Sequence, residues 1–122
     1  MLNKQYRFHS RGGVRYVFQK GKIIRSPKLS LVFAHNPKGF TRFAVVVSKK
    51  VLKSAVGRNF IRRRIYEAIR LNFSSFPKQR DYIIVVFSKD IANLPFKELE
   101  KTLKSLVADS KVCRLVDRKS VV

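Results

Sequence analysis

The stretch that decides the fold is SKKVLKSAVGRNFIRRRIYEAIR, residues 48–70. From Ala55 to about Phe73 the apolar residues recur with the period of an α-helix, which predicts a helix over this range. At about 100° per residue, one arc of this helix is apolar: Ile61, Ile65, Ala68 and Ile69. We expect this arc to face a sheet, because an amphipathic helix buries its apolar side.

A second arc of the same helix is polar and basic. Its members follow one another at i, i+4, i+7 and i+11: Asn59, Arg63, Tyr66 and Arg70. Arg62 flanks this arc, and Arg58 stands at the helix entrance. The arc spans about 16 Å of helix axis at about 1.5 Å per residue, so it can reach several backbone phosphates. A guanidinium binds phosphate oxygens in pairs, an asparagine offers a donor and an acceptor, and a tyrosine ring can stack on an unpaired base.

A solvated helix face is the common explanation for a run of charges, but such a face normally mixes both signs. Glu67 is the one acid between residues 48 and 70, so like charges lie four residues apart, where they cost stability. A purpose other than folding is needed, and binding of RNA or DNA is the interpretation that we favour.

Ahead of this segment, the sequence predicts one helix and two strands. Ser10 could cap a helix that runs to about Lys20, with an apolar side made of Val14, Val17 and Phe18. Gly21 suits a left-handed helix end. Residues 28–34 alternate between two faces, as in a half-buried strand, and residues 43–47 form a more uniformly apolar strand that we expect to be central. The turn at residues 36–39, Asn-Pro-Lys-Gly, predicts that these two strands pair as an antiparallel hairpin.

Beyond the basic helix, residues 82–87 form a buried strand, so the helix crosses between two apolar strands and predicts a parallel pair. Pro95 begins a last helix with this apolar stripe: Phe96, Leu99, Leu103, Leu106 and Val107. Residues 117–122 are expected to fray. The predicted order is α-β-β-α-β-α, an α+β fold with a small mixed sheet in one domain over residues 1–122.

The charge of the chain is large and unevenly placed. Against 7 acidic residues there are 28 Lys and Arg, for a net charge of +21, and 17 of the basic residues precede Glu67, the first acid. A hydrophobic content of 45% is enough for a folded core. A folded domain with this imbalance repels itself, and a large anionic partner on one face is the simplest explanation.

Several classes of protein are disfavoured by what the sequence lacks. Cys113 is the single cysteine, so it cannot form an intramolecular disulfide, and no Cys/His cluster has metal-ligand spacing. His9 and His35 lack flanking acids, and no nucleophile–base arrangement is apparent, so we expect no catalytic residues. The N-terminus has no apolar signal-peptide core, and no stretch approaches the roughly 20 apolar residues of a membrane span. We therefore expect a cytoplasmic protein.

The motifs of the basic segment resemble the bacterial ribonuclease P protein component. The resemblance is carried by four runs: Val47-Ser48-Lys49-Lys50, Ala55-Val56-x-Arg58-Asn59-x-Ile61-Arg62-Arg63-x-Ile65, Val17-Phe18-x-x-Gly21 and Asp81-Tyr82-Ile83-Ile84. Together they cover about residues 6–110, and the Arg-Asn-x-Ile-Arg-Arg core is the specific part.

The resemblance implies a fold and a function. The fold would be an α/β sandwich with a left-handed βαβ crossover, of the ribosomal protein S5 domain 2-like type. The function would be that of the protein subunit of a ribonucleoprotein that removes the 5′ leader from precursor tRNA. Catalysis would reside in the RNA subunit, with Mg²⁺ held by RNA and substrate and no cofactor held by the protein. The partners would be one RNA subunit per protein monomer and precursor tRNA.

Two groups of site residues are implied by position. Those expected to bind the RNA subunit are Lys49, Lys50, Lys53, Arg58, Asn59, Arg62, Arg63, Tyr66 and Arg70. Those expected to line a cleft for the single-stranded leader, between the first helix and the sheet, are Val14, Phe18, Ser30 and Val32. Two positions depart from the family: Tyr66 stands where an arginine is usual, and Val14 stands where many members have phenylalanine.

Three alternatives stay open at the level of sequence. A ribosomal or general RNA-binding protein would share the charge without any part in cleavage. A protein-only nuclease would need a carboxylate cluster, which the first 66 residues cannot supply. A basic membrane-surface peptide is disfavoured because a folded core accounts for the apolar residues.

Overall fold

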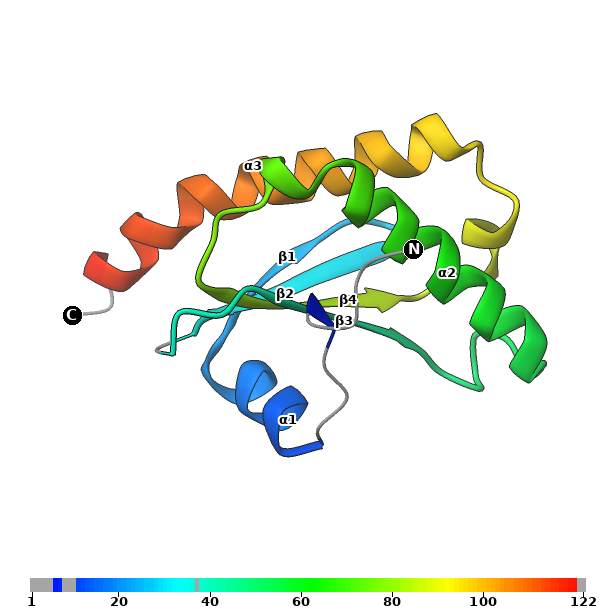
Figure 1. Ribbon diagram of the computed structural model, residues 1–122, viewed down its shortest axis with the longest axis horizontal. Helices are drawn as coiled ribbons and strands as arrows, with labels where there is room; N and C mark the ends of the chain where they lie inside the picture. Colours follow the sequence, from blue (N-terminus) through cyan, green and yellow to red (C-terminus); the bar gives the residue numbers. More distant parts are fainter. Residues whose placement is uncertain (1–5, 8–10, 37, 121–122) are drawn as a thin grey trace.

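The computed structural model describes residues 6–7, 11–36 and 38–120, and a four-stranded sheet lies at its centre. The elements in chain order are α1 (Arg11–Lys20), β1 (Lys22–Arg25), β2 (Leu29–His35), β3 (Arg42–Val47), α2 (Ala55–Leu71), β4 (Arg80–Val86) and α3 (Phe96–Ser120). Two short 3-10 turns, Phe73–Ser75 and Lys89–Ala92, flank β4. Figure 1 shows α2 and α3 on one side of the sheet and α1 on the other.

The strand order is β1-β2-β4-β3, so the last strand of the sequence lies between β2 and β3. β4 is antiparallel to β2 and parallel to β3, which confirms the predicted parallel pair around α2. The predicted hairpin between residues 28–34 and 43–47 is wrong, because the two strands do not pair. The prediction that residues 43–47 form a central strand is also wrong, since β3 lies at the edge of the sheet. Phe43, Val45 and Val47 are nevertheless buried in the main core, because α2 packs against β3.

β1 was not predicted. It is four residues long, KIIR, and pairs antiparallel with β2, so that Ile23 lies opposite Val32 and Arg25 opposite Ser30. The connecting turn is closed by Ser26, whose N–H and hydroxyl both donate to the carbonyl of Leu29, at 2.9 and 2.7 Å. A strand this short offers too few positions for an alternating pattern to be recognised in sequence.

The helix end at Gly21 is explained by a close approach and not by a left-handed conformation. Among the described glycines only Gly39, in the β2–β3 loop, has a positive φ, at 85°. A Cβ atom on Gly21 would lie 2.4 Å from the Val17 carbonyl oxygen and 2.5 Å from that of Phe33. Glycine is therefore needed where the chain passes from α1 to the sheet, for a different reason than predicted. The predicted cap, Ser10, lies outside the described residues.

The two faces of the sheet are covered unequally. The main core lies beneath α2 and α3, where Leu31, Phe43 and Ile84 are fully buried. A second cluster lies on the other face, where Val17 of α1 packs on these strand residues: Val32, Ala34, Ala44 and Ile83. Among the described helices, α1 alone packs on this second face, and it is ten residues long, whereas Val46 and Val85 there remain partly exposed.

α3 has the predicted apolar stripe, whose members Leu99, Leu103, Leu106 and Val107 are buried in the main core. The helix continues to Ser120, past Asp117, where the sequence predicted fraying. Within the described residues, no helix combines the length and apolar character needed to cross a membrane.

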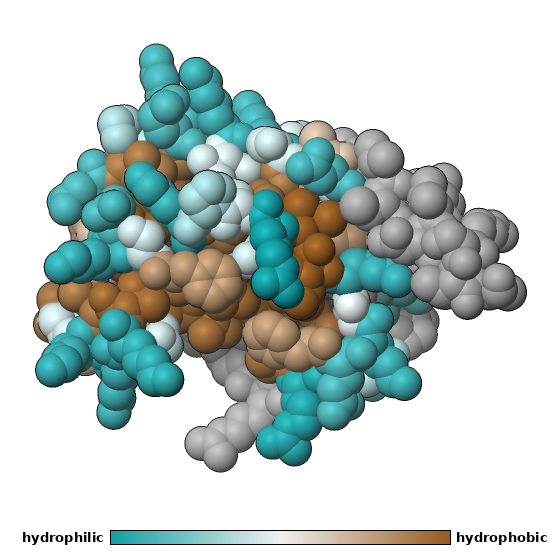
Figure 2. Space-filling model, turned by 180° about the vertical axis from the view of Figure 1, so that it is seen from behind, coloured by the Kyte–Doolittle hydropathy of each residue, from teal (hydrophilic) through white to brown (hydrophobic). Residues whose placement is uncertain are grey.

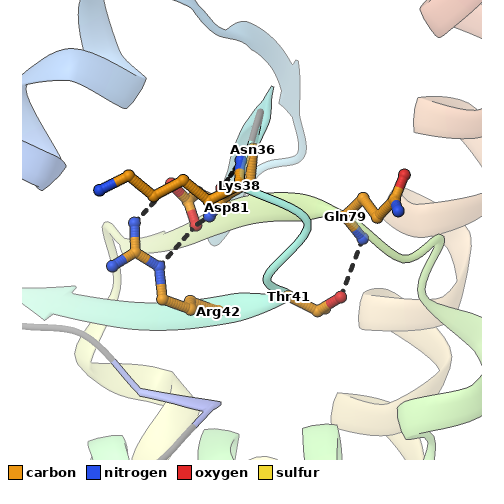
Figure 3. Close-up of polar contacts among 6 residues, drawn as sticks. All are labelled: Asn36, Lys38, Thr41, Arg42, Gln79 and Asp81. Atoms are coloured by element: carbon orange, nitrogen blue, oxygen red, sulfur yellow. Dashed lines mark hydrogen bonds and ion pairs between the residues drawn. The ribbon is translucent and has the colours of Figure 1, made fainter.

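The loop between β2 and β3 is tied to the start of β4 by a buried carboxylate (Figure 3). Asp81 accepts hydrogen bonds from Nδ2 of Asn36 and from Nε and Nη2 of Arg42, each at 3.0 Å. The backbone N–H of Gln79 donates to Oγ1 of Thr41 at 2.9 Å. These contacts hold β3 beside β4 at the end of the sheet where both strands begin.

Candidate RNA interface

The start of α2 is built from a folded basic loop. Oγ of Ser54, the N-cap residue, accepts a hydrogen bond from the N–H of Gly57 at 3.1 Å. Nη1 of Arg58 reaches back and donates to the carbonyls of Leu52 and Lys53, at 3.0 and 2.7 Å. Arg58 therefore fixes the loop against the first turn of the helix, in addition to carrying a charge of its own.

Three lysines of this loop are exposed beside the helix N-terminus: Lys49, Lys50 and Lys53. The N-terminus of a helix carries partial positive charge and free N–H groups, both of which favour an anion. The first turn of α2 contains no acidic residue. The loop and the helix entrance therefore form one continuous positive surface.

The arcs predicted for α2 are mostly confirmed. Ile61, Ile65, Ala68 and Ile69 are each fully buried in the main core. Asn59 and Arg63 are exposed, and Arg62 is partly exposed. Among the described residues, the ion pairs join Arg42 to Asp81, Arg70 to Glu67 and Lys101 to Glu98.

It follows that neither Arg62 nor Arg63 has a carboxylate partner within the described part of the chain. Their charges are available to an external anion.

Tyr66 departs most from the sequence prediction. Its side chain is only 4% exposed, and the guanidinium carbon of Arg7 lies 5.7 Å from the centre of its ring. Burial raises the pKa of the Tyr66 hydroxyl, although the backbone of Val45 and the charges of Arg7 and Arg62 oppose the rise. The prediction that Tyr66 faces outward to stack on a base is therefore wrong.

The reason lies in the position of β3. Because β3 is the edge strand, its outer side is accessible to Tyr66 of α2, which meets the backbone of Val45, and to Arg7, which forms an isolated parallel bridge with Phe43. The sequence pattern predicts that β3 is a central strand. A central strand has no open edge, so burial of Tyr66 against it was not expected.

Arg64 is the third arginine of the run, and its contacts lie within the protein and stabilise the fold. Its two terminal nitrogens donate to the carbonyls of Ile91 and Leu94, and its guanidinium carbon lies 6.0 Å from the centre of the Phe96 ring. These contacts tie α2 to the segment that leads into α3. Of three consecutive arginines, Arg64 is therefore engaged within the fold, whereas Arg62 and Arg63 remain candidates for the interface.

Arg70 is exposed, as predicted, but it forms an ion pair with Glu67. Its Nε donates to Oε1 of Glu67 at 3.0 Å, one helical turn away. The pKa of Glu67 is lowered from 4.5 to about 2, and this hydrogen bond from Arg70 is the largest cause. Because the folded pKa is lowered, the stabilisation from the Glu67 charge is present above pH 4.5 and is lost as the pH falls towards 2. At neutral pH Arg70 is therefore engaged within the protein.

Replacing Glu67 by glutamine is expected to strengthen RNA binding about threefold and to steepen the log–log salt dependence by about 0.7–0.9, the value for one added phosphate contact. The reason is that Arg70 no longer has a carboxylate partner on its own helix. Binding titrations at several salt concentrations measure both quantities. Glu98→Gln is the matched control, because Glu98 pairs with Lys101 at the same i, i+3 spacing on α3. Equal gains from both variants would assign the effect to total charge.

The predicted leader residues divide into two groups. Phe18 is 43% exposed on α1 and Val14 is partly exposed, so both present surface. Ser30 and Val32 lie on the α1 side of the sheet but are only 2% and 1% exposed. Val32 is covered by Val17. The prediction that Ser30 and Val32 line an accessible cleft is therefore wrong.

Sequence reasoning missed two residues on this face. Val46 and Val85 are partly exposed beside the α1 cluster, and the strand register places Val85 between Val46 and Ser30. The alternation within each strand shows their shared face, but only the observed strand order places them together.

Figure 2 shows the opposite side of the molecule from Figure 1, where hydrophilic side chains border a band of apolar ones.

No group of three or more histidine, cysteine, aspartate or glutamate side chains is arranged to hold a metal ion in the part of the chain that the structure describes. The buried carboxylate of Asp81 is already occupied by Asn36 and Arg42.

Comparison with known proteins gives consistent results. Residues 2–111 match the family described as Ribonuclease P. The ribonuclease P protein component of Finegoldia magna is 35% identical over 115 residues, which is 93% of this chain and 99% of that protein. The structure of the Staphylococcus aureus ribonuclease P protein has a TM-score of 0.76 at 23% identity, covering 89% of this chain and 98% of that one. The Thermotoga maritima protein has a TM-score of 0.74 at 24% identity, covering 83% and 94%.

Proposed function

This chain belongs to the Ribonuclease P family, and from that membership we propose that it is the protein subunit of a ribonuclease P ribonucleoprotein. The assembly would remove the 5′ leader from precursor tRNA, with one copy of this chain for each RNA subunit. The observation that carries the proposal is the outward side of α2, where Arg62 and Arg63 continue the positive surface of the loop before the helix.

The binding surface for the RNA subunit comprises the loop lysines and the outward residues of α2: Lys49, Lys50, Lys53, Arg58, Asn59, Arg62 and Arg63. Arginine forks bind phosphate oxygens in pairs, and Asn59 can bond to a ribose hydroxyl or a base edge. Arg70 adds a weaker contact, since it must first leave Glu67. Tyr66 supports this surface from within by packing beneath Arg7 and contributes no stacking.

The leader of precursor tRNA would lie across the α1 side of the sheet. Phe18, an exposed aromatic side chain of α1, would stack on an unpaired base, and the partly exposed Val14, four residues earlier, would widen the apolar surface. Mature tRNA has no leader, so contacts here favour substrate over product. The rest of the protein's contribution is electrostatic, because its positive charge screens repulsion between two RNA molecules.

Bond cleavage is assigned to the RNA subunit. Mg²⁺, held by the RNA and the substrate, would supply charge stabilisation and an activated water. The residues of this chain bind and orient RNA. Buried Asp81 and surface-paired Glu67 are already engaged by arginines, so neither is set up as a general base.

The test is reconstitution with a bacterial ribonuclease P RNA and a precursor tRNA carrying a labelled leader. We expect added protein to lower the Mg²⁺ concentration needed for half-maximal leader cleavage, and to strengthen binding of precursor tRNA more than of mature tRNA. Protein without RNA serves as the control and should leave the substrate intact. If the protein binds the RNA but changes neither the Mg²⁺ requirement nor the preference for precursor, it is a general RNA-binding protein.

A further inference from the structure

Phe87, the residue after β4, is an exposed aromatic side chain on the α1 side of the sheet. Its backbone N–H donates to the carbonyl of Lys28 at 2.9 Å, which extends the β2–β4 ladder by one residue. Side chains alternate along a strand, and Val86 is buried in the main core beneath α2 and α3. Phe87 therefore points to the opposite face, and its side chain is 56% exposed.

This side chain extends an accessible apolar surface. Val85 shares its face, and in the parallel pair Val85 lies beside Val46. Both valines are partly exposed, whereas Ile83 and Ala44, two residues earlier on their strands, are buried under α1. Among the described residues of this face, Val46, Val85 and Phe87 thus present accessible apolar surface at one end of the sheet.

The surroundings of Phe87 are basic. The strand register puts Lys28 beside it on the β2 side, and the continuation of β3 puts Ser48 beside it on the other, directly before Lys49 and Lys50. Both of these lysines are exposed. In Figure 1 the end of β4 and the loop before α2 lie together on the right, whereas the β2–β3 loop lies on the left.

We propose that Phe87 stacks on a base of the single-stranded leader, and that it joins the α1 side of the sheet to the lysines of the RNA-subunit surface. An apolar ring bordered by cations has the composition of a single-strand site, in which aromatic faces bind bases and cations follow the phosphates. An apolar protein partner would gain nothing from the lysines. The inference rests on the proposed function, since it assumes that a leader crosses this face.

The experiment uses the reconstituted holoenzyme and precursor tRNAs whose leaders increase in length one nucleotide at a time, with mature tRNA as the zero point. Phe87→Ala should bind mature tRNA and the shortest leaders as the wild type does, and should weaken binding about fivefold, the effect of losing one stacked base, once the leader reaches the ring. Phe87→Trp should retain full affinity, whereas Phe87→Leu should behave like alanine. Since Phe87 is exposed, the thermal unfolding of these variants should match the wild type.

Phe40→Ala is the matched control. Phe40 is 57% exposed, so an equal apolar area is removed, but it lies in the loop at the other end of the sheet. It should show no dependence on leader length. An equal loss for Phe40→Ala and Phe87→Ala, a loss that includes mature tRNA, or full affinity with leucine would each overturn the assignment of base stacking.

The leader contact and the role of Phe87 are distinguished by different results. If the wild-type holoenzyme shows no preference for longer leaders, the proposed leader contact itself is wrong. If the wild type shows that preference and Phe18→Ala reduces it, while Phe87→Ala equals the wild type at every length, then only the role of Phe87 is excluded.

Discussion

With Arg62 and Arg63 both replaced by alanine, the protein is expected to bind the RNA subunit about a hundredfold more weakly, because each charge-assisted hydrogen bond contributes about 1.5 kcal/mol or more. Neither arginine has a carboxylate partner among the described residues, so both are available to phosphates in the free protein. The salt dependence should fall as well, by about 1.4–1.8 in log–log slope for two lost phosphate contacts. Titrations of the RNA subunit across a range of salt concentrations give both values.

The control for this variant keeps the total charge equal. Lys97→Ala combined with Lys104→Ala also removes two exposed cations, but from α3. A long-range field would respond to both double variants alike, whereas direct contact responds only to the pair on α2. An unchanged salt slope for the Arg62 and Arg63 variant would contradict phosphate contact, even if affinity fell.

The helical part of this site was predictable because it depends on local periodicity. A 3.6-residue repeat is enough to separate Ile61, Ile65 and Ile69 from Arg62 and Arg63, and the structure confirms that division. The absence of acids from residues 48–66 was equally visible in the sequence. These two features carry most of the proposed RNA surface.

Periodicity does not show which arginine side chains are bound by other groups of the protein and which are exposed and unpaired. Arg64 is held by carbonyls 27 and 30 residues away, at Ile91 and Leu94. No pattern within α2 distinguishes it from Arg63. For Arg70 the partner was close enough to foresee, because an acid three residues away on a helix is within reach.

The order of the strands could not be predicted from the sequence, for a different reason. Alternation shows which residues of a strand share a face, but not which strand lies beside it. A short turn between residues 35 and 42 suggested a hairpin, yet β4 enters between the two strands. The burial of Tyr66 against β3 depends on this order, and Val32 is buried beneath Val17 of α1, so neither could be predicted from the pattern of one strand.

Replacing Asp81 by alanine is expected to destabilise the fold by about 2–3 kcal/mol, the cost of removing one member of a largely buried, hydrogen-bonded pair. Asp81 is 5% exposed and accepts three hydrogen bonds, one from Asn36 and two from Arg42 (Figure 3). Without the carboxylate, the amide of Asn36 loses this acceptor in a site that is 4% exposed. The side chain of Arg42 is 32% exposed and can recover part of its hydration, which keeps the loss below that of a fully buried pair. Denaturant unfolding measures the change.

The control for Asp81→Ala must account for charge, because the loss of any acid from a chain of net charge +21 increases its self-repulsion. Asp109→Ala makes the same change at an exposed position of α3 and should leave stability within about 0.5 kcal/mol of the wild type. Asp81→Asn, which keeps the size of the side chain and one carbonyl acceptor, should fall between the two. The tie lies at the opposite end of the sheet from Lys49 and Lys50, so the folded Asp81→Ala protein should bind the RNA subunit with unchanged affinity. Equal losses for the Asp81 and Asp109 variants would mean that net charge, and not the bonds between β4 and the β2–β3 loop, sets the stability at this site.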